Sequence, residues 1–129
     1  MQPFPSLPED RDEQVEWFHD LASLVEAGRV NLGELVLRTE ISEFVTQHLP
    51  SHTLPVGMTD AECMNAVRIL RENESSWNRA LMRAISEACD LAASGEPQRA
   101  AEDLRAFASI CPWVLFAEVA MNQASHFPA

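Results

Sequence analysis

The apolar residues of this chain recur at intervals of three and four, which is the spacing of an amphipathic α-helix. Between residues 10 and 27, for example, they form one stripe, and Gly28 follows as a suitable helix stop. Alternation with a period of two is absent and β-branched clusters are few, so no strand is predicted. The sequence therefore predicts an all-α fold, a bundle of about five to six helices.

Residues that cap or interrupt helices set the expected boundaries. Asn31 with Glu34, and Thr59 with Glu62, have the spacing of a capping box at a helix start. Residues that prefer caps interrupt the pattern at 73–75, which predicts a break there. The expected helices run from about 10 to 27, from 31 to before Pro50, from 59 to about 73, from there to about 93, from 97 to Pro112, and from 113 onward.

The length of 129 residues fits one domain with one core. Residues 1–8 contain three prolines and are expected to form an extended N-terminal arm, which Phe4 and Leu7 could hold against the body. Residues 9–129 are expected to form a single helical domain.

Cys111 lies between an apolar run and Pro112, where it could be either a reactive thiol or a packed residue at a helix junction. Proline suits the first position of a helix, so Trp113 is expected to begin the last one. No adjacent residue supplies the cation that lowers a thiol pKa, which favours the structural role. An enzyme using Cys111 and a distant histidine stays as an alternative.

The formal net charge of −11 narrows the possible partners. Such a field repels nucleic acid and anionic membranes and attracts cationic partners. The three cysteines are far apart and no signal-peptide pattern opens the chain, so we expect a reduced, cytoplasmic protein. No apolar stretch approaches the roughly 20 residues of a membrane span. A monomer or weak dimer is expected.

The strongest surface signal is a row of acids opposite the apolar stripe of the first helix. Like charges four apart destabilise a helix, which suggests selection for binding, although acids in a first turn also favour the helix dipole. Trp17, at the edge of this row, is either an interface anchor or a boundary core residue. In the second helix Glu34 is placed to pair with Arg38. The candidate partner-binding residues are Asp12, Glu13, Glu16, Trp17, Asp20, Glu40 and Glu43.

No catalytic, metal-binding or cofactor-binding residues are predicted. His48 and His52 have a spacing that suits a metal on a continuous helix, but Pro50 between them forbids that geometry. No Ser-His-Asp order, glycine-rich phosphate loop or paired buried carboxylates can be identified. We therefore expect a binding protein and not an enzyme.

The stretch from 81 to 114 resembles one tetratricopeptide helical hairpin. Small residues, bulky residues and a closing proline stand at the spacings of that repeat, namely Ala88, Ala100, Leu104, Phe107 and Pro112. Ala84 and Glu87 replace its usual tryptophan and glycine. The resemblance implies an antiparallel helix pair that closes on alanines.

The segment SGEPQRAAEDLRAFASICPWVLFAEVAMNQ also resembles the C-terminal part of small acidic bacterial immunity proteins. These proteins neutralise toxins of contact-dependent inhibition and other polymorphic toxin systems. The resemblance implies a class of function, and no toxin-binding residue is matched by it.

Charge and resemblance together predict an immunity protein that covers the active site or substrate groove of a cationic toxin domain. We expect a nuclease (an RNase, a tRNase or a DNase), because its groove must already be positive. The alternative is a helical adaptor or secretion chaperone that binds a partner segment in a groove beside the C-terminal hairpin.

Overall fold

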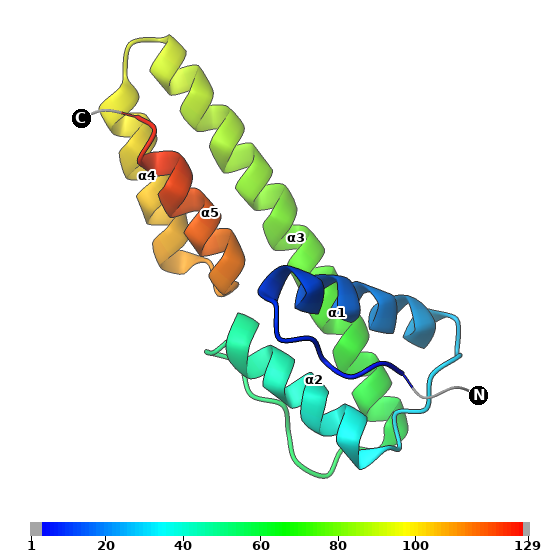
Figure 1. The fold of residues 1–129 in the computed structure, drawn as a ribbon. Coiled ribbons are helices and arrows are strands. Elements are labelled where there is room, and N and C mark those ends of the chain that lie inside the picture. Colours follow the sequence, from blue (N-terminus) through cyan, green and yellow to red (C-terminus); the bar gives the residue numbers. More distant parts are fainter. Residues whose placement is uncertain (1–3, 128–129) are drawn as a thin grey trace. The chain divides into compact units, whose positions relative to one another are not determined.

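The protein is all-α, as the sequence predicts. The computed structural model describes residues 4–127, and this range contains five α-helices and no strand (Figure 1). The helices are α1 (Arg11–Glu26), α2 (Leu35–His48), α3 (Asp60–Ala93), α4 (Pro97–Ile110) and α5 (Val114–Ala124). Residues 1–3 of the expected arm lie outside the described residues.

The chain forms two compact units, Met1–Asn73 and Glu74–Ala129. Each unit has buried apolar residues of its own, and α3 contributes its first part to one unit and the remainder to the other. The single helical domain expected over residues 9–129 stays a prediction.

The expected helix break at 73–75 is wrong, because α3 is continuous over 34 residues. Asparagine and serine disfavour a helix interior by only a few tenths of a kcal/mol each, so packing decides. Leu70 and Leu81, on either side of the expected break, are both buried, and Glu74 is buried as well. Two expected helices are therefore one.

The first unit is built around aromatic packing between α1 and α2. Phe18 is completely buried and stacks on Phe44, with 4.5 Å between ring centroids and 14° between planes. Apolar residues of the first part of α3, including Val67 and Leu70, are also buried. This packing holds the polar face of α1 outward.

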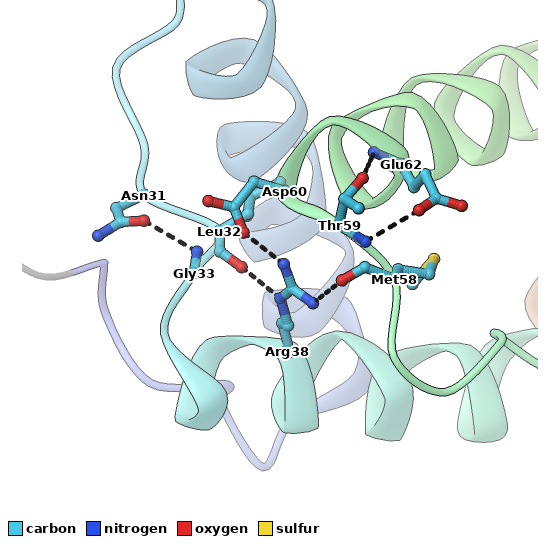
Figure 2. Close-up of polar contacts among 8 residues, drawn as sticks. All are labelled: Asn31, Leu32, Gly33, Arg38, Met58, Thr59, Asp60 and Glu62. Carbon is cyan, nitrogen blue, oxygen red and sulfur yellow. Dashed lines mark hydrogen bonds and ion pairs between the residues drawn. The ribbon is translucent and has the colours of Figure 1, made fainter.

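Arg38 of α2 ties together the two loops of the first unit (Figure 2). Its guanidinium donates hydrogen bonds to the backbone oxygens of Leu32 and Met58 and forms a 2.5 Å ion pair with Asp60. The expected pairing of Arg38 with Glu34 is replaced by these contacts. Three chain segments thus meet at one side chain.

The expected N-cap at Asn31 is also wrong. Its side-chain oxygen accepts a 2.8 Å hydrogen bond from the Gly33 backbone N–H, which closes a turn, and α2 begins later, at Leu35. Glu34 takes the N-cap position without a side-chain cap bond.

The capping box at the start of α3 is confirmed (Figure 2). The Thr59 hydroxyl accepts from the Glu62 N–H, and the Glu62 carboxylate accepts from the Thr59 N–H, both at 3.1 Å. The hydrogen bond from the Thr59 backbone N–H to the carboxylate, followed by the Thr59 hydroxyl, lowers the pKa of the Glu62 carboxyl.

The second unit packs the end of α3 against α4 and α5 through small residues. Its central cluster consists of Ala88, Ala100, Ala101, Leu104 and Ala124. Gly95 has a φ of +87°, a conformation that favours glycine, and Pro97 lies in the first turn of α4. The helices α4 and α5 run antiparallel, side by side (Figure 1).

Cys111 is the C-cap of α4, so it lies at a helix junction as expected. The last helix begins one residue later than predicted: Trp113 is extended and is the N-cap of α5. Its side chain is buried, and its ring lies 6.2 Å from the Phe116 ring, centroid to centroid.

Candidate functional site

The exposed face of α1 presents a row of carboxylates. Asp12, Glu13, Glu16 and Asp20 are all exposed, while Phe18 on the opposite face is buried. Within residues 4–127 none of the four forms an ion pair. The helix dipole accounts for the two acids in the first turn, but it acts only over that turn and does not account for Glu16 and Asp20.

A cleft of about 1010 Å³ lies beside this row; we call it the α1 cleft. Three of the four acids line it, and Asp12 does not. Its other charged lining residues are Arg29 and Glu34. Its apolar lining consists of Phe4, Pro5, Pro8, Trp17, Leu24, Val30 and Leu37. The cleft therefore combines an apolar surface with four carboxylates and one guanidinium.

Trp17 is a core residue and not an exposed anchor, which decides between the two interpretations of the sequence. Only 5% of its surface is exposed. Its indole N–H donates a 2.8 Å hydrogen bond to the Pro5 oxygen, and the Phe4 ring meets it edge-on at 5.4 Å. The N-terminal arm covers Trp17, so only the arm's path could have shown its burial.

Glu40 and Glu43 of α2 do not line the α1 cleft. Glu40 is half-buried and its carboxylate accepts a hydrogen bond from the Leu7 backbone N–H, so it holds the arm. Glu43 is exposed. The structure thus brings Glu13, Glu16 and Asp20 together and gives Glu40 a different environment.

Most of the cleft lining was not among the residues predicted from the sequence. It consists of the arm residues and of Ser23, Leu24, Arg29, Val30, Asn31, Glu34 and Leu37. Phe4 and Leu7 gave the available signal, because apolar residues in a proline-rich segment suggest attachment. The helix to which they attach depends on contacts between distant residues, which no local pattern encodes.

A buried hydrogen-bonded chain links the arm to the end of α2. The Gln14 side-chain amide donates to the Pro8 oxygen at 2.8 Å, so its oxygen is left to accept from His48 Nε2 at 2.7 Å. The His48 ring is buried and stacks on Phe44 with 4.4 Å between centroids. Burial, together with the charge of Arg11, lowers the pKa of His48 from its ordinary 6.5.

We expect His48 to make the protein less stable in mild acid. The folded state favours the neutral ring. The full contribution of His48 to the free energy of unfolding is therefore present above pH 6.5. This contribution is lost as the pH falls below 6.5 and through the lowered pKa that His48 has in the folded state. The reason is that the unfolded chain binds the proton more readily. Urea unfolding between about pH 7.5 and pH 5.5 measures this loss.

Two glutamine variants make this prediction specific. In His48→Gln the loss of stability over this pH range should shrink, whereas His52→Gln, in the exposed loop after α2, should keep the wild-type slope. Equal slopes for wild type and His48→Gln would contradict the assignment.

The thiols of Cys63 and Cys111 give no sign of activation. Burial raises the pKa of both Cys111 and Cys63. The Cys111 thiol donates a hydrogen bond to the Trp113 backbone oxygen, at 3.7 Å. A raised pKa reduces the reactive thiolate at neutral pH. Across residues 4–127 no group of three or more His, Cys, Asp or Glu side chains is placed to hold a metal ion.

The fold and the cleft define a class only: an all-α protein with an acidic, partly apolar cleft on its first helix. In the described part of the chain, no helix combines the length and apolar character that crossing a membrane requires. Comparison with protein family models, with curated proteins and with solved structures finds no match to this chain.

Proposed function

We propose that this protein is an immunity protein that binds and neutralises a cationic toxin domain, and that the toxin is a nuclease. The observation that supports this most is the exposed row of carboxylates on α1 beside a cleft, which form no ion pair within residues 4–127. Within residues 4–127, three arginines form ion pairs with acids outside this row. Arg38 pairs with Asp60, Arg68 with Glu26 and Arg99 with Glu96.

The proposed mechanism is electrostatic capture followed by apolar contact. Carboxylates on α1 take the place of nucleic acid phosphates and pair with lysines and arginines of the toxin's substrate groove, which blocks that groove. Opposite charge speeds the encounter, and the apolar lining of the α1 cleft slows dissociation. Since Trp17 is covered, Phe4, Leu24 and Val30 are better candidates for direct contact.

No chemical step is assigned to the protein in this proposal. It acts in the cytoplasm as a monomer or weak dimer, with its three cysteines as free thiols. A basic toxin domain encoded beside its gene is the partner to test. The proposal fails if the purified protein neither binds that domain nor protects cells that express it.

Reversing the charge of Asp12, Glu16 and Asp20 to lysine should slow association with the toxin domain. Electrostatic steering raises association rates by about 10- to 1000-fold, so we expect a loss in this range at low salt. The dependence of the rate on salt, from about 0.05 to 0.5 M, should flatten. Stopped-flow association measures both effects.

The matched control reverses three exposed acids of the second unit, Glu87, Glu102 and Asp103. It changes the net charge by the same amount and should reduce the rate much less. Helical circular dichroism checks that both triple variants stay folded. Equal losses of association rate in the two variants would show that the net charge alone sets the rate, with no particular role for the α1 face.

A second candidate function, a helical adaptor or secretion chaperone, is favoured by an apolar groove on α4 and α5. This groove of about 380 Å³ is lined by Arg105, Ala108, Ser109, Ala117, Glu118 and Met121. Ile110 is 69% exposed and Met121 49%. Binding there would depend weakly on salt, which distinguishes it from capture by α1.

A further inference from the structure

We infer that the α1 cleft is a docking site for one extended, arginine-bearing and otherwise apolar segment of the protein partner, with the N-terminal arm as part of the site. The inference rests on the proposed function and states where and how the partner is held. The observations that support it are the apolar and acidic lining of the cleft and the hydrogen bonds that hold the arm.

The size and lining of the cleft favour a chain segment. Ligand pockets typically measure about 300–1000 Å³, so about 1010 Å³ accommodates a few side chains and not a whole domain surface. Much of the lining is apolar, from the Phe4 ring to Leu24, Val30 and Leu37. An apolar segment would remove this surface from water.

Charge complementarity favours arginine as the basic residue of the bound segment. Four lining carboxylates (Glu13, Glu16, Asp20 and Glu34) face one lining guanidinium, Arg29. Arginine fits this lining in two ways. Its planar guanidinium donates two parallel hydrogen bonds to a carboxylate, and its alkyl chain covers apolar surface. A segment with acidic side chains would be repelled.

The arm completes the site through backbone hydrogen bonds. Phe4, Pro5, Ser6 and Pro8 all line the cleft. The arm is held by the Trp17 indole on the Pro5 oxygen, by Gln14 on the Pro8 oxygen and by the Leu7 N–H on Glu40. Removing the Glu40 carboxylate should therefore weaken binding although Glu40 does not line the cleft.

The test is a titration of the full chain with a short, acetylated and amidated peptide in which leucine alternates with arginine. Nuclear magnetic resonance follows the indole N–H of Trp17, a lining residue whose N–H donates to the Pro5 oxygen of the arm, and calorimetry gives the affinity. We expect the Trp17 signal to shift on binding. The same peptide with glutamate in place of arginine should not bind.

Neutral variants of the same shape locate the site. Glu13→Gln, Glu16→Gln and Asp20→Asn combined should weaken binding by at least about tenfold, through lost charge-assisted bonds. The control combination Glu87→Gln, Glu102→Gln and Asp103→Asn should leave the affinity unchanged. Glu40→Ala should weaken binding, and Glu40→Gln, which keeps an acceptor for Leu7, should weaken it less.

Several outcomes would overturn the inference. They are equal affinities for the cleft and control combinations, an unshifted Trp17 signal, and binding of spermidine or free arginine as strong as that of the peptide. A toxin domain that binds the wild-type and cleft-neutral proteins equally well would reject this site while the proposed function stands. Peptide binding in the cleft, with no response to the toxin domain, would reject the proposed function and keep the site.

Discussion

Replacing Phe18 by alanine is expected to lower the free energy of unfolding by about 3–5 kcal/mol, the range for deleting a buried aromatic ring. Phe18 is 0% exposed and stacks on Phe44 at 4.5 Å, so its removal leaves a cavity between α1 and α2. The loss also includes the aromatic contact itself, which contributes about 0.5–1.5 kcal/mol beyond area burial. Urea unfolding followed by circular dichroism measures the change.

Phe4→Ala is the matched control for Phe18→Ala. The same ring is deleted, but Phe4 is only half-buried and belongs to the arm, so the cost should be clearly smaller. A loss of less than about 1 kcal/mol in Phe18→Ala would mean that the first unit is not organised around this stack.

Replacing Arg38 by alanine is expected to cost about 2–3 kcal/mol, because it strips hydrogen-bond donors from two backbone oxygens and a partner from Asp60. Leu32 is buried, so water cannot easily replace the guanidinium there. Arg38→Lys should recover only part of this loss, since an ammonium group lacks the fork that reaches all three acceptors. Thermal and urea unfolding measure both variants.

Arg99→Ala serves as the control for the Arg38 variants. Arg99 is 63% exposed and lies 3.9 Å from Glu96 in an i,i+3 pair, which predicts a change of at most about 0.5 kcal/mol. If Arg38→Ala were as mild as Arg99→Ala, the three contacts in Figure 2 would not hold the loops together.

The two stability predictions and the binding predictions concern different parts of the first unit. Phe18 and Arg38 keep α1 and α2 in place, whereas Glu13, Glu16 and Asp20 are exposed on the cleft lining. Neutral variants of these acids should therefore change binding with little change in stability. This separation lets a loss of binding be read as a loss of contact.

Much of the fold and part of the site could be predicted from the sequence. The helical periodicity, the stops at Gly28 and Gly95 and the capping box of Thr59 with Glu62 all depend on neighbours within a few residues. The acidic row on α1 follows from the same helical spacing. Such local features can be read along the chain because the interacting groups are close in sequence.

By itself, the sequence determined the all-α class, most helix ends and the face of α1 that carries the acids. Only the tertiary structure decided that α3 is continuous, that the arm covers Trp17, that Glu40 holds Leu7 and that Arg38 joins Leu32, Met58 and Asp60. The physical reason is that burial and long-range hydrogen bonds outweigh propensities of a few tenths of a kcal/mol. Those contacts join residues that become neighbours only when the chain has folded.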